Sequence, residues 1–212
     1  MGENNPDFDH GTITNMTPGH AEAVSRAHNA AFPNEVLPKL GHAFLSNLYK
    51  AILESESAFG VVCIVEGEVG GFVLANTDVE NMYKRVLRGH WPKLIGPLIT
   101  QLVKSPNLIP VVFETLFYGY RKDPRDTIKA EWMVWGVNPK YRGRNIGKRL
   151  VMKMNEMYKE RGVSVYKLIV YDSNDHVNSI YTSWGFKFLY KTKLYKKEAN
   201  IYKIDLTDNK IS

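Results

Sequence analysis

A basic segment at residues 142–149 has the composition of a phosphate-binding loop. It combines four cations with three residues that tolerate tight or left-handed turns: Arg142, Arg144, Lys148, Arg149, Gly143, Asn145 and Gly147. It matches neither G-x-G-x-x-G nor G-x-x-x-x-G-K-[ST], so it is neither a dinucleotide fingerprint nor a P-loop. Because backbone amides at a helix N-terminus bind anions, we predict a pyrophosphate cradle. The alternative is an ordinary strand-to-helix turn with solvated basic side chains.

The elements that must position this loop are a strand before it and a helix after it. Residues 128–137 are rich in strand-forming side chains, and residues 147–161 carry apolar side chains at helical spacing. Four cations around a helix N-terminus oppose the helix dipole, and a bound anion would remove that conflict. The strand, the loop and the helix therefore all favour an anion site.

The order of predicted elements along the chain is β-α-α-β-β-(helical insertion)-β-α-β-α-β-β. This order indicates the α/β class, with a mixed α+β sheet and helices on both faces. We expect a disordered tail at residues 1–10, one domain at residues 11–212, and a helical insertion near residues 78–120. The prolines of the insertion are predicted to mark helix boundaries: Pro92, Pro97, Pro106 and Pro110.

Composition limits the class of protein. The 212 residues are 44% apolar and 24% charged, as in soluble globular proteins, and the net charge of +6 favours anionic partners. The single cysteine, Cys63, lies in an apolar run and is expected to be buried. No secretory signal or transmembrane segment is evident, so a cytoplasmic protein is expected. The six histidines lack metal-ligand spacing, so no metal site is predicted.

Two separate motifs resemble the GNAT acetyltransferase family. The first is V-x-P followed by Q/R-x-x-G-x-G/A, and it is matched by residues 137–139 and 142–147, with Asn145 in place of a glycine. The second is N-x-x-A-x-x-x-Y-x-x-x-G-F, and it is matched by residues 174–186, with Val177 in place of the alanine. Because both motifs occur in the family's order, the resemblance implies the GNAT fold, with the helical insertion between its third and fourth strands.

The resemblance implies acetyl-CoA as co-substrate. The pantetheine arm would pair with the strand at Trp135, Gly136 and Val137, where a backbone N–H would also face the thioester oxygen. The diphosphate would lie on the loop formed by Arg142, Gly143, Arg144, Asn145, Ile146, Gly147 and Lys148. Asn174 would hydrogen-bond the arm or the adjacent loop, and it could also cap the helix that follows it.

The resemblance also implies two acid–base groups. Tyr181 matches the family's general acid, which protonates the departing thiolate, and the alternative is a buried packing tyrosine. Glu131 matches the glutamate base of some members, acting through water, and the alternative is a solvated carboxylate at the edge of a strand. Alternation along the strand would place four side chains on one face: Glu131, Met133, Trp135 and Val137.

The expected reaction is transfer of an acetyl group to the primary amine of a small molecule. From position alone, acceptor contacts are expected from His28, Phe32, Glu35 and Tyr83. The insertion is expected to shape the acceptor side or to form a homodimer contact. The alternatives are a protein N-terminal or lysine acetyltransferase, and an acyl-CoA-binding domain without catalysis. The basic and aromatic alternation at residues 186–195 would suit a nucleic-acid module, but a half-buried strand shows the same pattern, so no nucleic acid is predicted as a partner.

Overall fold

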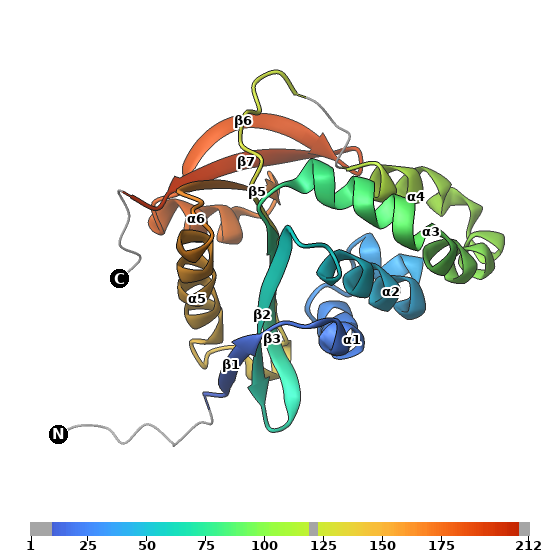
Figure 1. The fold of residues 1–212 in the computed structure, drawn as a ribbon, viewed down its shortest axis with the longest axis horizontal. Coiled ribbons are helices and arrows are strands. Elements are labelled where there is room, and N and C mark those ends of the chain that lie inside the picture. Colours follow the sequence, from blue (N-terminus) through green and yellow to red (C-terminus); the bar gives the residue numbers. More distant parts are fainter. Residues whose placement is uncertain (1–9, 119–122, 208–212) are drawn as a thin grey trace.

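The protein folds around one seven-stranded sheet with helices on both faces (Figure 1). The structure is a computed structural model and describes residues 10–118 and 123–207. Its strands are β1 (Thr12–Asn15), β2 (Ala58–Val65), β3 (Glu68–Asn76), β4 (Glu131–Val137), β5 (Val165–Tyr171), β6 (Lys187–Leu194) and β7 (Lys197–Asp205). Its α-helices are α1 (Ala21–Ala31), α2 (His42–Leu53), α3 (Val79–Lys104), α4 (Ile109–Leu116), α5 (Ile146–Glu160) and α6 (Asp175–Ser183). The predicted mixed sheet and the helical insertion between the third and fourth strands are confirmed.

The strand order is β1-β2-β3-β4-β5-β7-β6, and every neighbouring pair is antiparallel except β4 and β5. The parallel pair is short, because Glu131 lies opposite Lys167 and Trp132 opposite Leu168, and the register ends there. Beyond those two pairs β4 and β5 diverge. The sheet therefore contains a wedge-shaped opening at its centre.

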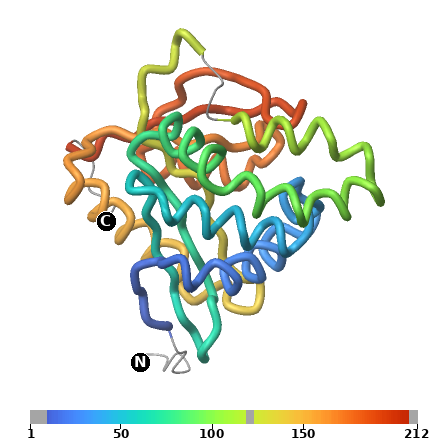
Figure 2. The backbone as a smooth tube through the Cα atoms, turned by 45° about the vertical axis from the view of Figure 1, so that its right-hand side comes forward, coloured from blue at the N-terminus to red at the C-terminus, as the bar shows by residue number. Residues whose placement is uncertain are grey.

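Two apolar clusters lie on opposite faces of the sheet. One packs α5 and α6 against the strands, and its most enclosed side chains include Leu150, Tyr158 and Tyr166. The other packs α1, α2, α3 and α4 against the opposite face, around Phe44 and Phe72. Figure 2 shows α1, α2 and α3 following one another across that second face. Burying both faces explains why the central strands β2 and β3 are almost continuously apolar.

A β-bulge changes the facing of side chains along β4. In the register with β3, Leu74 lies opposite Val134 and Ala75 lies opposite Trp132, so Met133 is an extra residue. The expected alternation of Glu131, Met133, Trp135 and Val137 on one face is therefore wrong. Trp135 and Val137 pack on the α5 side of the sheet, whereas Met133 packs with the cluster of α1 to α4.

The long helix α3 runs without a break through Pro92 and Pro97, which corrects the prediction that these prolines mark boundaries. A proline has no N–H to donate to the carbonyl four residues earlier, so Pro97 leaves the carbonyl of Lys93 without a helical partner. The side-chain amide of Asn47 on α2 donates to that carbonyl at 2.8 Å. The packing of α2 against α3 thus supplies the carbonyl of Lys93 with the hydrogen bond that the backbone of α3 cannot make.

The remaining predictions about the insertion and the chain ends have mixed outcomes. Pro106 opens a short 3-10 helix and Pro110 lies in the first turn of α4, so boundaries at these prolines are confirmed. Apart from His10, the predicted tail at residues 1–10 lies outside the described residues. Cys63 is fully buried, as expected. Within residues 10–118 and 123–207, no helix has the length and apolar character needed to cross a bilayer.

Candidate active site

A cavity of about 860 Å³ occupies the wedge between β4 and β5. Its walls come from α1 and the loop after it, from both diverging strands, from the loop before α5, from α6 and from the β6–β7 turn. Because the β4–β5 register ends at Trp132 and Leu168, the backbone edge of residues 133–137 that faces β5 has no strand partner in the described chain. That edge can hydrogen-bond an extended ligand as a further strand would.

The loop at residues 142–147 has the backbone of an anion cradle. Gly143 has φ of 82° and Asn145 has φ of 55°, both in the left-handed region that few side chains adopt. α5 begins directly afterwards at Ile146. The backbone N–H groups of its first turn have no helical partner and point out of the N-terminal end of the helix, where the loop lines the cavity. The expectation that Asn145 can take the left-handed conformation of the family's usual glycine is confirmed. Gly143, Asn145, Ile146 and Gly147 all line the cavity.

A glycine is needed at position 147 because the backbone there lies close to another side chain, and not because of its φ angle. A Cβ atom at this position would lie 2.7 Å from the indole ring of Trp135, well inside van der Waals contact. Trp135 is held in place by Trp132 and Trp184, whose rings are centred 6.0 and 5.6 Å away. The first turn of α5 therefore lies directly against the side chain that forms the wall of the wedge.

The four cations predicted to surround the loop serve different contacts. Arg142 lines the cavity, and its Nε donates to the carbonyl of Val137 at 3.3 Å. Arg144 pairs with Glu66 at 3.3 Å, and Arg149 donates to the carbonyl of Gly11 at 2.9 Å. Arg144, Lys148 and Arg149 are not among the lining residues. Contacts of Arg144 and Lys148 with a phosphate stay a prediction, and the guanidinium of Arg149 is engaged by the backbone carbonyl of Gly11.

Tyr181 lies on α6 in the wall of the cavity, near the point where the strands diverge. Its ring is enclosed by aromatic side chains, with centroids of Trp132, Trp135 and Phe186 between 5.3 and 6.2 Å away. Burial raises the pKa of Tyr181, so the phenol is protonated at neutral pH. Within the described part of the chain its hydroxyl has no hydrogen-bond partner, which leaves the proton free for a ligand atom.

Glu131 is 3% exposed, so the alternative of a solvated strand-edge carboxylate is wrong. The hydroxyl of Tyr118 donates to its Oε1 at 2.9 Å, and the Nζ of Lys167 lies 3.7 Å from its Oε2. Burial raises the pKa of Glu131, and the positive charge of Lys167 partly offsets that rise. Lys167 also forms an ion pair with Asp126. A carboxylate with a raised pKa is a stronger base than one in water.

Glu131 does not line the large cavity but a second one of about 120 Å³ beside it. The two cavities share six lining residues and are therefore adjacent: Leu37, Met133, Val134, Ile169, Leu194 and Tyr195. The walls of the second cavity are mostly aliphatic and aromatic, and Glu131 is the only carboxylate among them. Tyr83, expected as an acceptor contact, lines this second cavity and not the large one.

The other expected acceptor contacts, His28, Phe32 and Glu35, line the large cavity. The Nδ1 of His28 is 2.6 Å from the hydroxyl of Tyr49, and burial lowers the pKa of His28 to about 4. His28 is therefore neutral at physiological pH. Burial and the nearby negative charge of Glu35 raise the pKa of Tyr171 at the end of β5. Roles in acceptor binding stay predictions for all of them.

Two contacts in the cavity wall were beyond sequence reasoning. Tyr195 lies in the β6–β7 turn with φ of 49°, lines both cavities, and has its hydroxyl 2.9 Å from the hydroxyl of Thr115 on α4. Its backbone N–H donates to Glu114 at 2.6 Å. Both partners belong to the insertion, and no local pattern links them to the turn.

Asn174 lines the cavity and also caps α6, because its Oδ1 accepts from Val177 N–H at 3.3 Å.

The model of the "Acetyltransferase (GNAT) family" matches residues 21–186, which include the wedge, the loop and Tyr181. The chain belongs to this family of acetyltransferases. No curated protein matches the sequence of this acetyltransferase. The GNAT family uses acetyl-CoA as acyl donor, and the open edge of β4 with the loop at its end suits that extended, phosphate-bearing molecule.

Solved structures show the same fold at low sequence identity. The ribosomal-protein-S18-alanine N-acetyltransferase from Escherichia coli has a TM-score of 0.58 and 15% identity, over 92% of this chain and 94% of that chain. An N-acetyltransferase from Staphylococcus aureus Mu50 has a TM-score of 0.58 and 15% identity, over 91% and 100% of the two chains. NAA60 from Arabidopsis thaliana, solved in complex with acetyl-CoA, has a TM-score of 0.55 and 14% identity, over 92% and 99%.

Proposed function

We propose that this GNAT acetyltransferase transfers the acetyl group of acetyl-CoA to the primary amine of a small molecule. The observation that carries the proposal is the single cavity that joins an anion-binding loop, an unpaired strand edge and a buried phenol. The diphosphate would lie on residues 142–147, and the pantetheine arm would run along Trp135, Gly136 and Val137. This arrangement would bring the thioester beside Tyr181.

The chemistry is a direct attack of the amine nitrogen on the thioester carbonyl. The C–N bond forms, the C–S bond breaks, and the thiolate of coenzyme A takes a proton from the Tyr181 hydroxyl. The attacking nitrogen loses its remaining extra proton as the amide forms, and that proton restores the Tyr181 phenol. A backbone N–H on the open edge of β4 would stabilise the oxyanion that develops on the carbonyl. Because a primary alkyl amine is mostly protonated at neutral pH, it must first lose a proton, and we assign this step to Glu131 acting through water.

The size of the second cavity supports a small acceptor. At about 120 Å³ it is slightly smaller than an engineered cavity of about 150 Å³ that binds benzene, so it suits a compact apolar substituent. Neutral His28 and the ring of Phe32 extend this apolar character into the larger cavity. The second candidate is a protein N-terminus, because one structural neighbour is named for acetylating an alanine of a ribosomal protein.

The test has two stages. Calorimetry with acetyl-CoA is expected to show binding, and loss of that binding in Gly147→Ala would locate it at the loop. Release of coenzyme A is then measured with alkyl and arylalkyl amines, amino sugars, amino acids and alanine-initiated peptides. Turnover with a compact apolar amine and little with peptides is the expected result. Fast turnover with peptides alone would replace the small acceptor with a protein N-terminus.

Two variants test the catalytic roles. Tyr181→Phe and Glu131→Gln keep the size of each side chain and are expected to lower kcat by about a hundredfold, with acetyl-CoA binding unchanged. Unchanged turnover in either variant would remove that residue from the mechanism. Binding of acetyl-CoA without turnover on any amine would leave an acyl-CoA-binding domain without catalysis.

A further inference from the structure

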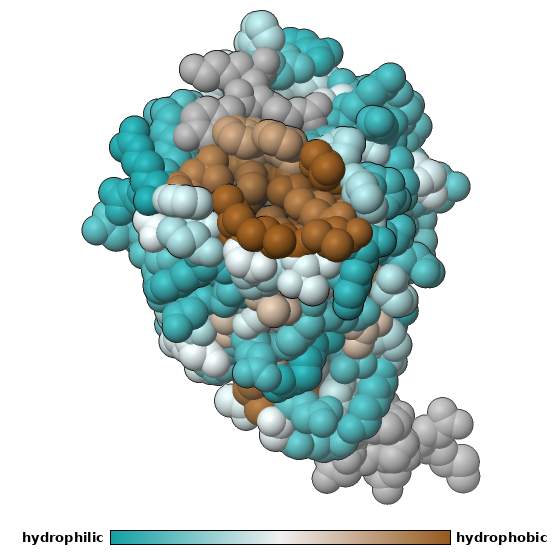
Figure 3. All heavy atoms as spheres, turned by 90° about the vertical axis from the view of Figure 1, so that its right-hand side faces the viewer, coloured by the Kyte–Doolittle hydropathy of each residue, from teal (hydrophilic) through white to brown (hydrophobic). Residues whose placement is uncertain are grey.

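The second half of α3 and the whole of α4 carry large apolar side chains on their outer surface. We call this surface the α3–α4 apolar face. Its members are Trp91, Ile95, Ile99, Val103, Ile109, Phe113 and Phe117. The exposed fractions of Trp91, Val103 and Phe113 are 54%, 77% and 60%, far above what side chains in the apolar clusters show. Figure 3 shows one continuous hydrophobic area on the side of the molecule that these helices form.

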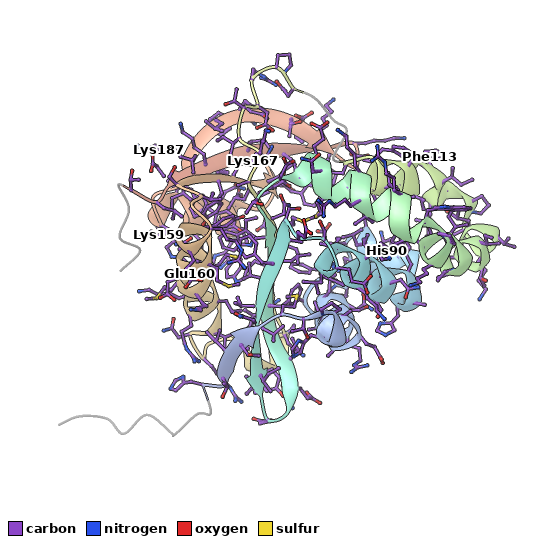
Figure 4. The ribbon with its side chains drawn as sticks, in the orientation of Figure 1. His90, Phe113, Lys159, Glu160, Lys167 and Lys187 are labelled. Carbon is purple, nitrogen blue, oxygen red and sulfur yellow. The ribbon has the colours of Figure 1, made fainter. Side chains whose placement is uncertain are left out.

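The face is built by helical spacing and not by scattered exposure. Trp91, Ile95, Ile99 and Val103 follow one another at intervals of four residues and so lie along one side of α3. On α4, Phe113 points away from the body of the protein (Figure 4). Each helix also has a separate buried side that packs on the protein, through Leu94 and Leu98 on α3. The exposed side chains therefore lie outside the packed core.

The charges on this part of the chain are almost all positive. From residue 91 to residue 122 the basic residues are Lys93, Lys104, Arg121 and Lys122, and the only acidic residue is Glu114. Lys93 and Lys104 are exposed, whereas Glu114 is partly buried and accepts a hydrogen bond from the backbone of Tyr195. Arg121 and Lys122 lie outside the described residues. The apolar face is thus accompanied by exposed positive charge that no exposed acidic side chain of this segment balances.

We propose that the α3–α4 apolar face docks on the surface of a membrane that contains anionic lipid. Exposed tryptophan, phenylalanine and aliphatic side chains enter the boundary between headgroups and acyl chains, and the exposed Lys93 and Lys104 of α3 add attraction to the negative headgroups. A second copy of the chain fits less well, because a two-fold interface brings the same surface together twice and would bring the exposed lysines of two α3 helices toward each other. The helices lie on the bilayer and do not cross it.

The position of the face connects docking to the active site. α4 presents Phe113 outward, and its inner side supplies Thr115 to the wall of the second cavity. Thr115 also contacts the Tyr195 hydroxyl at the turn that borders both cavities. A membrane on the outer side of α4 would therefore lie behind the wall of the proposed acceptor cavity. The proposal goes beyond acetyl transfer and stands without it.

The test is flotation of the full chain with vesicles of phosphatidylcholine alone and of phosphatidylcholine mixed with phosphatidylserine. The wild-type protein is expected to float with the mixed vesicles and to bind them less as salt is raised. Ile99→Gln with Phe113→Gln, and separately Lys93→Gln with Lys104→Gln, are each expected to lower the partition coefficient by about tenfold or more. Met152→Gln with Phe188→Gln is the matched control, because these exposed apolar side chains lie on α5 and β6.

Each result decides the proposal. Circular dichroism and release of coenzyme A with a water-soluble amine verify that the variants fold and keep their activity. No flotation of the wild-type protein, or equal flotation of wild type and both double variants, would overturn membrane docking. A different result would make the face an interface between two copies. In that case the wild-type protein would form a concentration-dependent dimer in sedimentation, the variant with both Ile99→Gln and Phe113→Gln would be monomeric, and neither would bind vesicles.

Discussion

The two faces of the sheet are built on different principles. On the α5 side, a loop, a helix N-terminus and Tyr181 lie within two short sequence motifs, and the structure brings them to one cavity. On the side of α1 to α4, the cavity walls are assembled from segments far apart in the chain, such as His28, Tyr83 and Tyr195. The α5 side holds the two motifs that resemble the family, and the other side holds the residues that we propose contact the acceptor.

Under the proposed function, this difference separates binding of the donor from choice of the acceptor within one fold. The phosphate loop depends on local backbone geometry, such as the positive φ of Gly143 and Asn145. The acceptor side depends on burial, which makes His28 neutral and raises the pKa of Glu131. Substitutions on the α5 side should therefore change binding of acetyl-CoA, and substitutions on the other side should change acceptor choice and stability.

The largest expected effect lies on the acceptor side and depends on pH. His28 has a folded pKa of about 4 because of burial, against about 6.5 in an unfolded chain, so the unfolded state binds its proton first as pH falls. Its contribution to stability is complete above about pH 6.5 and is lost as the pH falls to about 4, by roughly 3 kcal/mol. Urea unfolding of wild type and His28→Gln across this range should show a steeper loss for the wild type. Parallel curves would contradict the neutral buried histidine.

Two glycines provide the next test, one on each side of the comparison. Gly147→Ala should weaken acetyl-CoA binding by about tenfold to a hundredfold, because the added methyl group would overlap the ring of Trp135 and force the loop to shift. Gly96→Ala in α3 meets nothing within 4 Å and should raise stability by about 0.5 to 1 kcal/mol. Calorimetry and thermal unfolding measure the two effects. Equal acetyl-CoA affinity in both variants would mean that the loop does not hold the ligand.

A smaller effect is expected from the left-handed residue before α5. Asn145→Ala should destabilise the protein by about 1 to 2 kcal/mol, because alanine has a larger penalty than asparagine in this conformation. Asn145→Gly is the matched control and should unfold within about 0.5 kcal/mol of the wild type, since glycine adopts the conformation freely. Denaturant unfolding gives both values. Identical stability of the alanine and glycine variants would argue against a left-handed residue here.

The smallest effect tests the proline-containing helix. Asn47→Ala removes the side-chain donor to the Lys93 carbonyl and should lower the free energy of unfolding by about 0.5 to 1 kcal/mol. Hydrogen exchange should also quicken in α3 around Pro97 and not in α5. Asn107→Ala at an exposed position serves as control and should change neither quantity. Unaltered exchange in Asn47→Ala would mean that α3 passes its prolines without help from α2.

The sequence predicted those features that depend on neighbours along the chain. Helical spacing after Gly147, the apolar strands and the left-handed tolerance of Asn145 are local properties, and the structure has them where they were expected. Three local inferences failed where distant residues decide. A bulge opposite Leu74 and Ala75 changed the facing of β4, packing on α2 carried α3 through its prolines, and burial turned Glu131 from an edge carboxylate into an interior one.

The amino-acid order alone determined the family and predicted a phosphate-binding loop and an acetyl-CoA donor, because these depend on backbone conformation and spacing within a few residues. Only the tertiary structure decided which cations face the cavity, that a second cavity lies beside the first, and that apolar side chains of α3 and α4 remain outside. The physical reason is that burial and charge pairing are sums over the whole fold. Contacts such as Arg144 with Glu66 join segments that no local pattern relates.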